Sequence, residues 1–198
     1  MLAISHAATA LLLKRWQPEA PMAWVLFAVE LPAILWLLLR FAGIEDADGY
    51  MPYSHSLATL LPLACVLWLL FGALFRRRAM AAVGVAGILA HFALDLILHA
   101  QPLALAPFLS SVHVGLSLST VPPLAVAAAL AYGLLCWLVF RGGKALLAAI
   151  ALLSVAQLTF PVPPGVDIAV AMAAVWYLSR ARAAELEHPD RRLARAFA

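Results

Sequence analysis

A series of long, almost uncharged apolar runs constrains the fold of this chain more than any other feature of its sequence. The longest are Met22–Ala42, His55–Phe75, Ala79–His99 and Pro122–Phe140. An α-helix needs about 20 apolar residues to cross the hydrocarbon core of a bilayer. The composition agrees, because 66% of the residues are hydrophobic and 12% are charged, whereas about a quarter of the residues of a soluble domain are charged. The sequence therefore predicts an integral membrane protein.

Shorter apolar segments set the expected number of crossings. Lys144–Phe160 is a plausible span, and Leu2–Leu13 and Val166–Leu178 are short for a full crossing unless they tilt, re-enter or use flanking residues. We expect an all-α fold, a multi-pass transmembrane helical bundle of five to seven helices, with seven favoured. The expected transmembrane domain covers residues 1–180, and a basic cytoplasmic tail covers residues 181–198.

Charge placement predicts the orientation of the bundle. With seven crossings, every basic cluster lies on the same side of the membrane, which the positive-inside rule assigns to the cytoplasm. These clusters are Lys14 with Arg15, Arg76–Arg78, Arg141 with Lys144, and the basic residues from Arg180 to Arg195. The expected location is the cell inner membrane, with the C-terminus cytoplasmic. The net charge of +3 is explained by this topology, so we expect membrane lipids as partners and no nucleic acid.

Ionisable residues within the apolar segments are the candidates for function, because each costs about 2.5–3.5 kcal/mol at the centre of a membrane helix. They are His6, Glu30, His55, His91, Asp95 and His99. The last three are spaced by four residues, so they share one helix face. Gly84 and Gly87 precede them and would let a neighbouring helix approach closely. Most of this polar set lies toward the end of the bundle opposite the basic clusters.

Histidine and aspartate side chains from different helices are typical ligands of a divalent metal, and imidazole with carboxylate suits zinc. The pattern alone favours a shared site for His55, His91 and Asp95. Ser54 and Ser56 flank His55 and are candidates to contact a ligand or substrate. Glu30 is either a general base or a structural partner. His99 and His113, each taken alone, are more readily explained as packing residues.

Four stretches in order along the chain resemble the family of membrane-bound metal-dependent hydrolases. They are ISHAATALL with His6, VELPAILW, PYSHSL with His55 and Ser56, and LAHFALDLILH with His91 and Asp95. The resemblance extends from Met1 to about Leu118. It implies a divalent metal, with zinc expected first and manganese or iron as alternatives, held by His6, His55, His91 and Asp95. It also implies hydrolysis, for which Glu30 and Ser56 are the candidate catalytic residues.

One departure from the family pattern leaves the function open. Where the family has Leu-Pro-Asp, this chain has Leu31, Pro32 and Ala33, so either Glu30 replaces the missing carboxylate or a ligand is lost. The first hypothesis is a hydrolase that acts on a lipid-like ester or phosphoester near the outer leaflet. The second is a non-catalytic scaffold or assembly protein with a structural or decayed metal site. A proton or metal transporter ranks third, because few polar residues continue into the cytoplasmic half.

Overall fold

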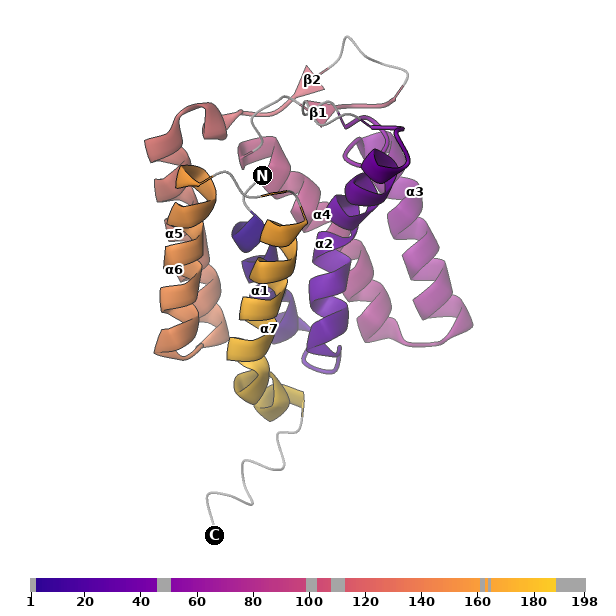
Figure 1. The fold of residues 1–198 in the computed structure, drawn as a ribbon. Helices are drawn as coiled ribbons and strands as arrows, with labels where there is room; N and C mark the ends of the chain where they lie inside the picture. Colours follow the sequence, from indigo (N-terminus) through magenta and orange to yellow (C-terminus); the bar gives the residue numbers. More distant parts are fainter. Residues whose placement is uncertain are drawn as a thin grey trace.

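Helices that run back and forth in one bundle make up most of the chain (Figure 1). The computed structural model describes residues 3–45, 51–98, 103–107, 113–160, 163 and 165–187. The α-helices in these ranges are α1 (Ala3–Trp16), α2 (Met22–Phe41), α3 (Leu57–Leu67), α4 (Arg78–Leu98), α5 (Pro122–Phe140), α6 (Lys144–Thr159) and α7 (Val166–Glu187). The predicted all-α bundle is confirmed.

Four helical segments are long and apolar enough to cross a membrane. They are Met22–Phe41, Leu57–Leu74, Arg78–Leu98 and Pro122–Phe140. The second of them consists of α3 and a π-helical segment, Trp68–Leu74, that continues it. Helix α6 is a shorter apolar helix. The chain is therefore membrane-embedded, while the seven-crossing topology and its orientation stay predictions.

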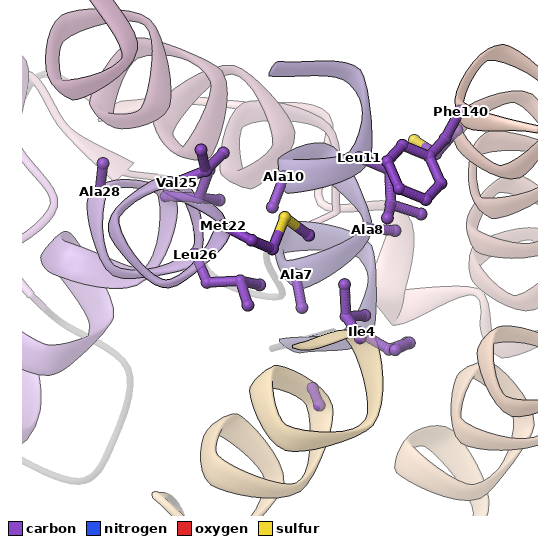
Figure 2. Packing of buried hydrophobic residues seen from close by; sticks show 14 of the residues in the cluster. Ile4, Ala7, Ala8, Ala10, Leu11, Met22, Val25, Leu26, Ala28 and Phe140 are labelled. Atoms are coloured by element: carbon purple, nitrogen blue, oxygen red, sulfur yellow. The ribbon is translucent and has the colours of Figure 1, made fainter. Parts of the chain in front are cut away.

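Helix α1 lies in the middle of the bundle, where it contacts α2, α4, α5, α6 and α7 (Figure 1). Its 14 residues span about 21 Å, less than the hydrocarbon thickness. Ile4, Ala7, Ala8 and Leu11 are fully buried in the largest hydrophobic cluster (Figure 2). The small alanine side chains let the surrounding helices come close. Because neighbouring helices rather than lipid enclose it, α1 does not need the length of a lipid-exposed span.

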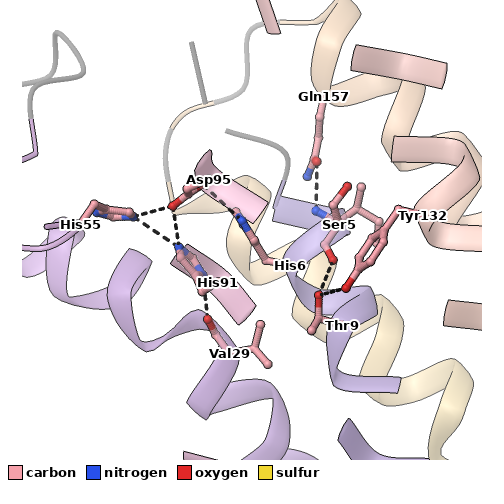
Figure 3. Close-up of polar contacts among 10 residues, drawn as sticks. Ser5, His6, Thr9, Val29, His55, His91, Asp95, Tyr132 and Gln157 are labelled. Carbon is pink, nitrogen blue, oxygen red and sulfur yellow. Dashed lines mark hydrogen bonds and ion pairs between the residues drawn. The ribbon is translucent and has the colours of Figure 1, made fainter. Parts of the chain in front are cut away.

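Buried hydrogen bonds connect α1 to the second half of the chain. The backbone N–H of Ile4, in the first turn of α1, donates to Oε1 of Gln157 at 3.1 Å. The Thr9 hydroxyl donates to the Ser5 carbonyl at 3.0 Å and therefore accepts from the Tyr132 hydroxyl at 2.9 Å (Figure 3). These bonds satisfy polar groups that are buried or partly buried. Gln157, an isolated polar residue in an apolar segment, thus has a structural partner in α1.

The other end of α1 is held by a buried lysine. Lys14 is fully enclosed, and its Nζ donates to the carbonyls of Pro18 and Ala20, at 2.7 Å in each case. Both carbonyls belong to the connection between α1 and α2. A cation among carbonyl oxygens at a helix C-terminus also opposes the negative end of the helix dipole. Lys14 thus links the last turn of α1 to the α1–α2 connection through two hydrogen bonds.

Helices α2 and α4 touch at a glycine. A Cβ atom on Gly87 would lie 2.9 Å from the Ala28 carbonyl carbon and 3.0 Å from the Val29 nitrogen. A Cβ on Gly84 would lie 3.1 Å from a Leu67 side-chain carbon of α3. The expectation that both glycines permit close approach is confirmed. The contact at Gly87 brings the backbone of α2 next to the turn of α4 that ends at His91.

A short hairpin covers the end of the bundle where α2 ends and α3 begins (Figure 1). Strand β1 (Leu103–Ala104) pairs antiparallel with β2 (His113–Val114), with Leu103 opposite Val114. The sequence predicts only a long loop here, because strands of two residues carry no periodic signal. His113 lies in β2, and His99 lies outside the described residues.

Helix α7 continues past residue 180, the predicted end of the transmembrane domain, to Glu187. The position of the domain boundary stays a prediction, because a helix can extend beyond the bilayer. Nη1 of Arg182 pairs with Oε2 of Glu185 at 2.7 Å, and this i,i+3 pair supports the helix beyond the apolar segment. The rest of the predicted tail, residues 188–198, lies outside the described residues.

Candidate metal centre

Four side chains converge inside the bundle from three places in the chain (Figure 3). His6 comes from α1, His55 lies two residues before α3, and His91 and Asp95 lie one turn apart on α4. Each is at most 2% exposed. The structure thus brings together all four of the residues predicted as metal ligands.

Asp95 is the common partner of the three imidazoles. Its Oδ2 lies 3.2 Å from Nε2 of His91 and 3.4 Å from Nε2 of His55, and its Oδ1 lies 3.3 Å from Nε2 of His6. Such contacts are longer than typical charge-assisted hydrogen bonds, which are 2.7–2.9 Å long. One carboxylate therefore faces three nitrogen atoms without a short bond to any of them.

The tautomer of His91 follows from its contact with α2. Nδ1 of His91 lies 2.7 Å from the Val29 carbonyl oxygen, which can only accept, so this nitrogen donates its N–H. In the neutral ring Nε2 then carries a lone pair. This Nε2 lies 3.3 Å from Nε2 of His55.

The tautomer of His55 follows from a hydrogen-bonded chain through Ser54 to Glu45. The Ser54 hydroxyl donates to Oε2 of Glu45 at 2.6 Å, so its oxygen accepts the Nδ1–H of His55 at 2.8 Å. Glu45 is itself held by the backbone N–H groups of Tyr53 and Ser54, which donate to its Oε1 at 2.7 and 3.0 Å. In the neutral ring Nε2 of His55 therefore also carries a lone pair.

A triangle of acceptor atoms results from these two tautomers. Nε2 of His55, Nε2 of His91 and Oδ2 of Asp95 lie 3.2–3.4 Å apart. Acceptors this close repel one another unless a cation lies among them. In a tetrahedral zinc site with bonds of 2.0–2.1 Å, two ligand atoms are separated by about 3.3 Å. The residues present therefore fit a divalent metal ion in both donor type and spacing.

Glu30 joins the centre from α2. One ligand atom from each of His6, Glu30 and His91 lies within 4.8 Å of the others, and the same holds for His55, His91 and Asp95. Both carboxylate oxygens of Glu30 and Nδ1 of His6 are buried without a hydrogen-bond partner among the described residues. The His6 ring stacks on His91, with 4.0 Å between centroids. The structure thus adds the predicted catalytic carboxylate to the cluster.

Ser56 differs from the other candidates. Its hydroxyl is buried and lies 3.0 Å from that of Thr59, one turn into α3. None of its hydrogen bonds within the described residues reaches a histidine, so contact with a substrate stays a prediction. The residues that orient His55 are its neighbour Ser54 and, through Ser54, Glu45.

Sequence reasoning missed Glu45. Its segment, IEDADGYMPY, has several acidic residues, and no pattern distinguishes Glu45 from the others.

Comparisons of the chain with protein-family models, curated proteins and solved structures found no match. The resemblance carried by PYSHSL and AHFALD therefore stays a prediction. The chemistry open to the centre follows from its donor set of three imidazoles and two carboxylates, all enclosed. Such a set can hold a metal ion, and orienting bonds to Nδ1 like those of His55 and His91 are usual for metal-ligating histidines.

Proposed function

We propose that this protein is a membrane-embedded hydrolase whose divalent metal is held by His6, His55, His91 and Asp95. The observation that carries the proposal is the triangle of acceptor atoms at 3.2–3.4 Å, two of them imidazole nitrogens whose opposite N–H groups already donate elsewhere. Zinc suits this donor set best, with manganese and iron as alternatives. When bound, such a metal lowers the pKa of a water ligand and polarises an ester or phosphoryl oxygen.

Glu30 is the proposed proton acceptor. Its carboxylate is enclosed beside His6 and His91, and no hydrogen bond from the described residues occupies either oxygen. A general base must reach the proton that it removes and must not be neutralised by a strong partner. Ser56 directly follows His55 and is the proposed hydroxyl contact to a substrate.

The proposed substrates are lipid-like esters or phosphoesters. The centre lies inside a bundle with four apolar segments suited to a bilayer, so a substrate that partitions into the membrane reaches it more readily than a soluble one. His91 and Asp95 lie in the last two turns of α4, which begins at Arg78, so the cluster is far along α4 from the end that carries Arg76–Arg78. With the basic end in the cytoplasm of the cell, as the positive-inside rule predicts, the reaction takes place near the outer leaflet of the inner membrane.

Metal analysis of the purified full-length protein tests the proposal. We expect about one equivalent of a transition metal by plasma mass spectrometry in the wild type, and loss of that metal in His91→Ala/Asp95→Ala. Asp167→Asn is the matched control, because Asp167 accepts from the backbone N–H groups of Gly165 and Ile168 at the start of α7. A wild type that retains no metal after reloading with zinc or manganese contradicts the proposal.

Activity measurements follow on the metal-loaded protein. Panels of phospholipid, polyprenyl phosphate and acyl-ester substrates in mixed micelles are the assay. We expect hydrolysis of one class by the wild type and a large loss of kcat in Glu30→Gln. A metal-loaded protein that cleaves none of these substrates contradicts hydrolysis while leaving the metal site intact.

The second candidate is a structural metal site in a non-catalytic membrane scaffold. The observation that favours it is the enclosure of the cluster, since all five carboxylate and imidazole side chains are at most 2% exposed. A structural site keeps its metal closed off by protein ligands. Slow removal of the metal by a chelator, unfolding on its loss and no turnover would support this candidate over the hydrolase.

A further inference from the structure

We propose that the Arg76–Arg78 cluster forms a binding pocket for the phosphate group of an anionic phospholipid. The pocket lies at the end of the bundle opposite the hairpin, between the α3–α4 and α1–α2 connections, and does not depend on the metal centre. Its volume is about 580 Å³. It is lined by Glu19, Pro21, Phe75, Arg76, Arg77, Arg78, Ala79 and Met80.

The position of the pocket matches the level of lipid headgroups. The apolar segment of α3 and its π-helical continuation ends at Leu74, and α4, the next apolar segment, begins at Arg78. The arginines therefore directly adjoin two membrane segments. Phe75, which is 55% exposed, places an apolar ring beside them. Basic pockets between membrane helices at this level are suited to lipid phosphates.

The charge of the pocket favours an anion. Arg76, Arg77 and Arg78 are exposed, and their guanidinium groups have no hydrogen bond or ion pair with any residue that the structure describes. Glu19 is the one carboxylate in the lining, so positive charge is in excess. Guanidinium groups bind phosphate oxygens through paired N–H donors. The Arg side chains are thus available to a phosphate.

One wall of the pocket is held in place by the bundle. Nε1 of Trp24, in the first turn of α2, donates to the carbonyl of Met80 at 3.0 Å. The backbone N–H of Arg77 donates to the Phe71 carbonyl at 2.6 Å, which holds the connection against the π-helical segment that continues α3. A headgroup would therefore meet arginines on a backbone that the bundle holds in place, so that on binding mainly the side chains need ordering.

Lipid titration of the full-length protein in detergent, followed by native mass spectrometry, tests the proposal. The probes are phosphatidylglycerol and phosphatidylcholine with identical acyl chains, and inorganic phosphate in a separate arm. We expect the wild type to bind phosphatidylglycerol more tightly. Arg77→Gln/Arg78→Gln should weaken this binding by about fivefold per arginine, or about 25-fold in total. Glu19→Gln should strengthen it.

The matched control is Arg141→Gln/Lys144→Gln, which removes the same charge from the α5–α6 connection, and its affinity should stay close to that of the wild type. Equal affinity for the two lipids overturns the proposal, because the charge of the headgroup then has no effect. An equal loss in both double variants also overturns it, because only general surface charge then acts. Thermal stabilisation by inorganic phosphate without a preference for phosphatidylglycerol assigns the pocket to a soluble anion and also overturns it. If the arginine variant does not fold, the Glu19→Gln variant provides the test, and unchanged binding of phosphatidylglycerol by that variant overturns the proposal.

Discussion

Nε2 of His55 and Nε2 of His91 lie 3.3 Å apart, although each ring already donates its Nδ1–H in another direction. His91 donates to the Val29 carbonyl of α2, whereas His55 donates to the Ser54 hydroxyl. The first partner is backbone, which no substitution removes. The second is a side chain, so the orientation of His55 is the one that mutation can test.

Ser54→Ala should weaken zinc binding by about 10–100-fold, because loss of an orienting hydrogen bond typically has this effect on a ligating histidine. The measurement is zinc affinity in detergent by competition with a chromophoric chelator. Ser56→Ala is the matched control, since its hydroxyl pairs with Thr59 and not with His55. Equal affinities of the two variants would contradict the role of the Glu45–Ser54–His55 chain.

Glu30→Met should stabilise the metal-free protein, because it replaces a buried carboxyl group that has no hydrogen-bond partner among the described residues with an apolar side chain of similar size. The expected gain is about 1–3 kcal/mol in the free energy of unfolding, seen as a higher Tm after chelation. Zinc affinity separates the two roles of this residue. An unchanged affinity agrees with a general base, and a large loss identifies Glu30 as a ligand.

Gly87→Ala should destabilise the bundle by about 1–3 kcal/mol, since its Cβ would meet the backbone of Ala28 and Val29 at 2.9–3.0 Å. Pushing α2 from α4 also lengthens the bond from His91 to Val29, so metal retention should fall with Tm. Gly143→Ala is the control, because a Cβ there meets nothing within 4 Å. A Gly87→Ala protein with the wild-type Tm would contradict the close contact.

Lys14→Met should lower the free energy of unfolding, because two carbonyls, of Pro18 and Ala20, lose their donor inside the protein. The expected loss is about 1–3 kcal/mol for each unsatisfied carbonyl. Lys144→Met removes an exposed lysine at the start of α6 and should change Tm little. Thermal unfolding of both variants in the same detergent provides the comparison, and similar Tm values would argue against the buried role of Lys14.

The membrane helices are predictable from sequence because an apolar run has to match the thickness of a bilayer. The expected span Pro122–Phe140 agrees with α5 in both bounds, and Ala79–His99 agrees with α4 within one residue at each end. The spacing of four between His91 and Asp95 likewise predicts one face, and the structure places both in the same cluster. Local periodicity is sufficient for these features.

Features that depend on contacts between distant segments are not predictable in this way. The length of α1 does not show that five helices enclose it, and the acidic loop does not show that Glu45 reaches Ser54. The extension of α7 to Glu187 also depends on side-chain contacts. The charged residues after 180 predict the limit of the bilayer, and the pair of Arg182 with Glu185 supports the helix beyond that point.

The central position of α1 has a consequence for the order of assembly. Helix α1 leaves the ribosome before every helix that encloses it. Its contacts extend along the chain to α7, and its Ile4 is hydrogen-bonded to Gln157, 153 residues later. Until those helices arrive, its buried hydroxyl and imidazole groups face lipid or the insertion machinery. Contacts of such long sequence separation form late and slowly. Early in synthesis α1 should therefore be surrounded by lipid or by the insertion machinery instead of by its final helical neighbours. Completion of the bundle around α1 should be the slow step of biogenesis.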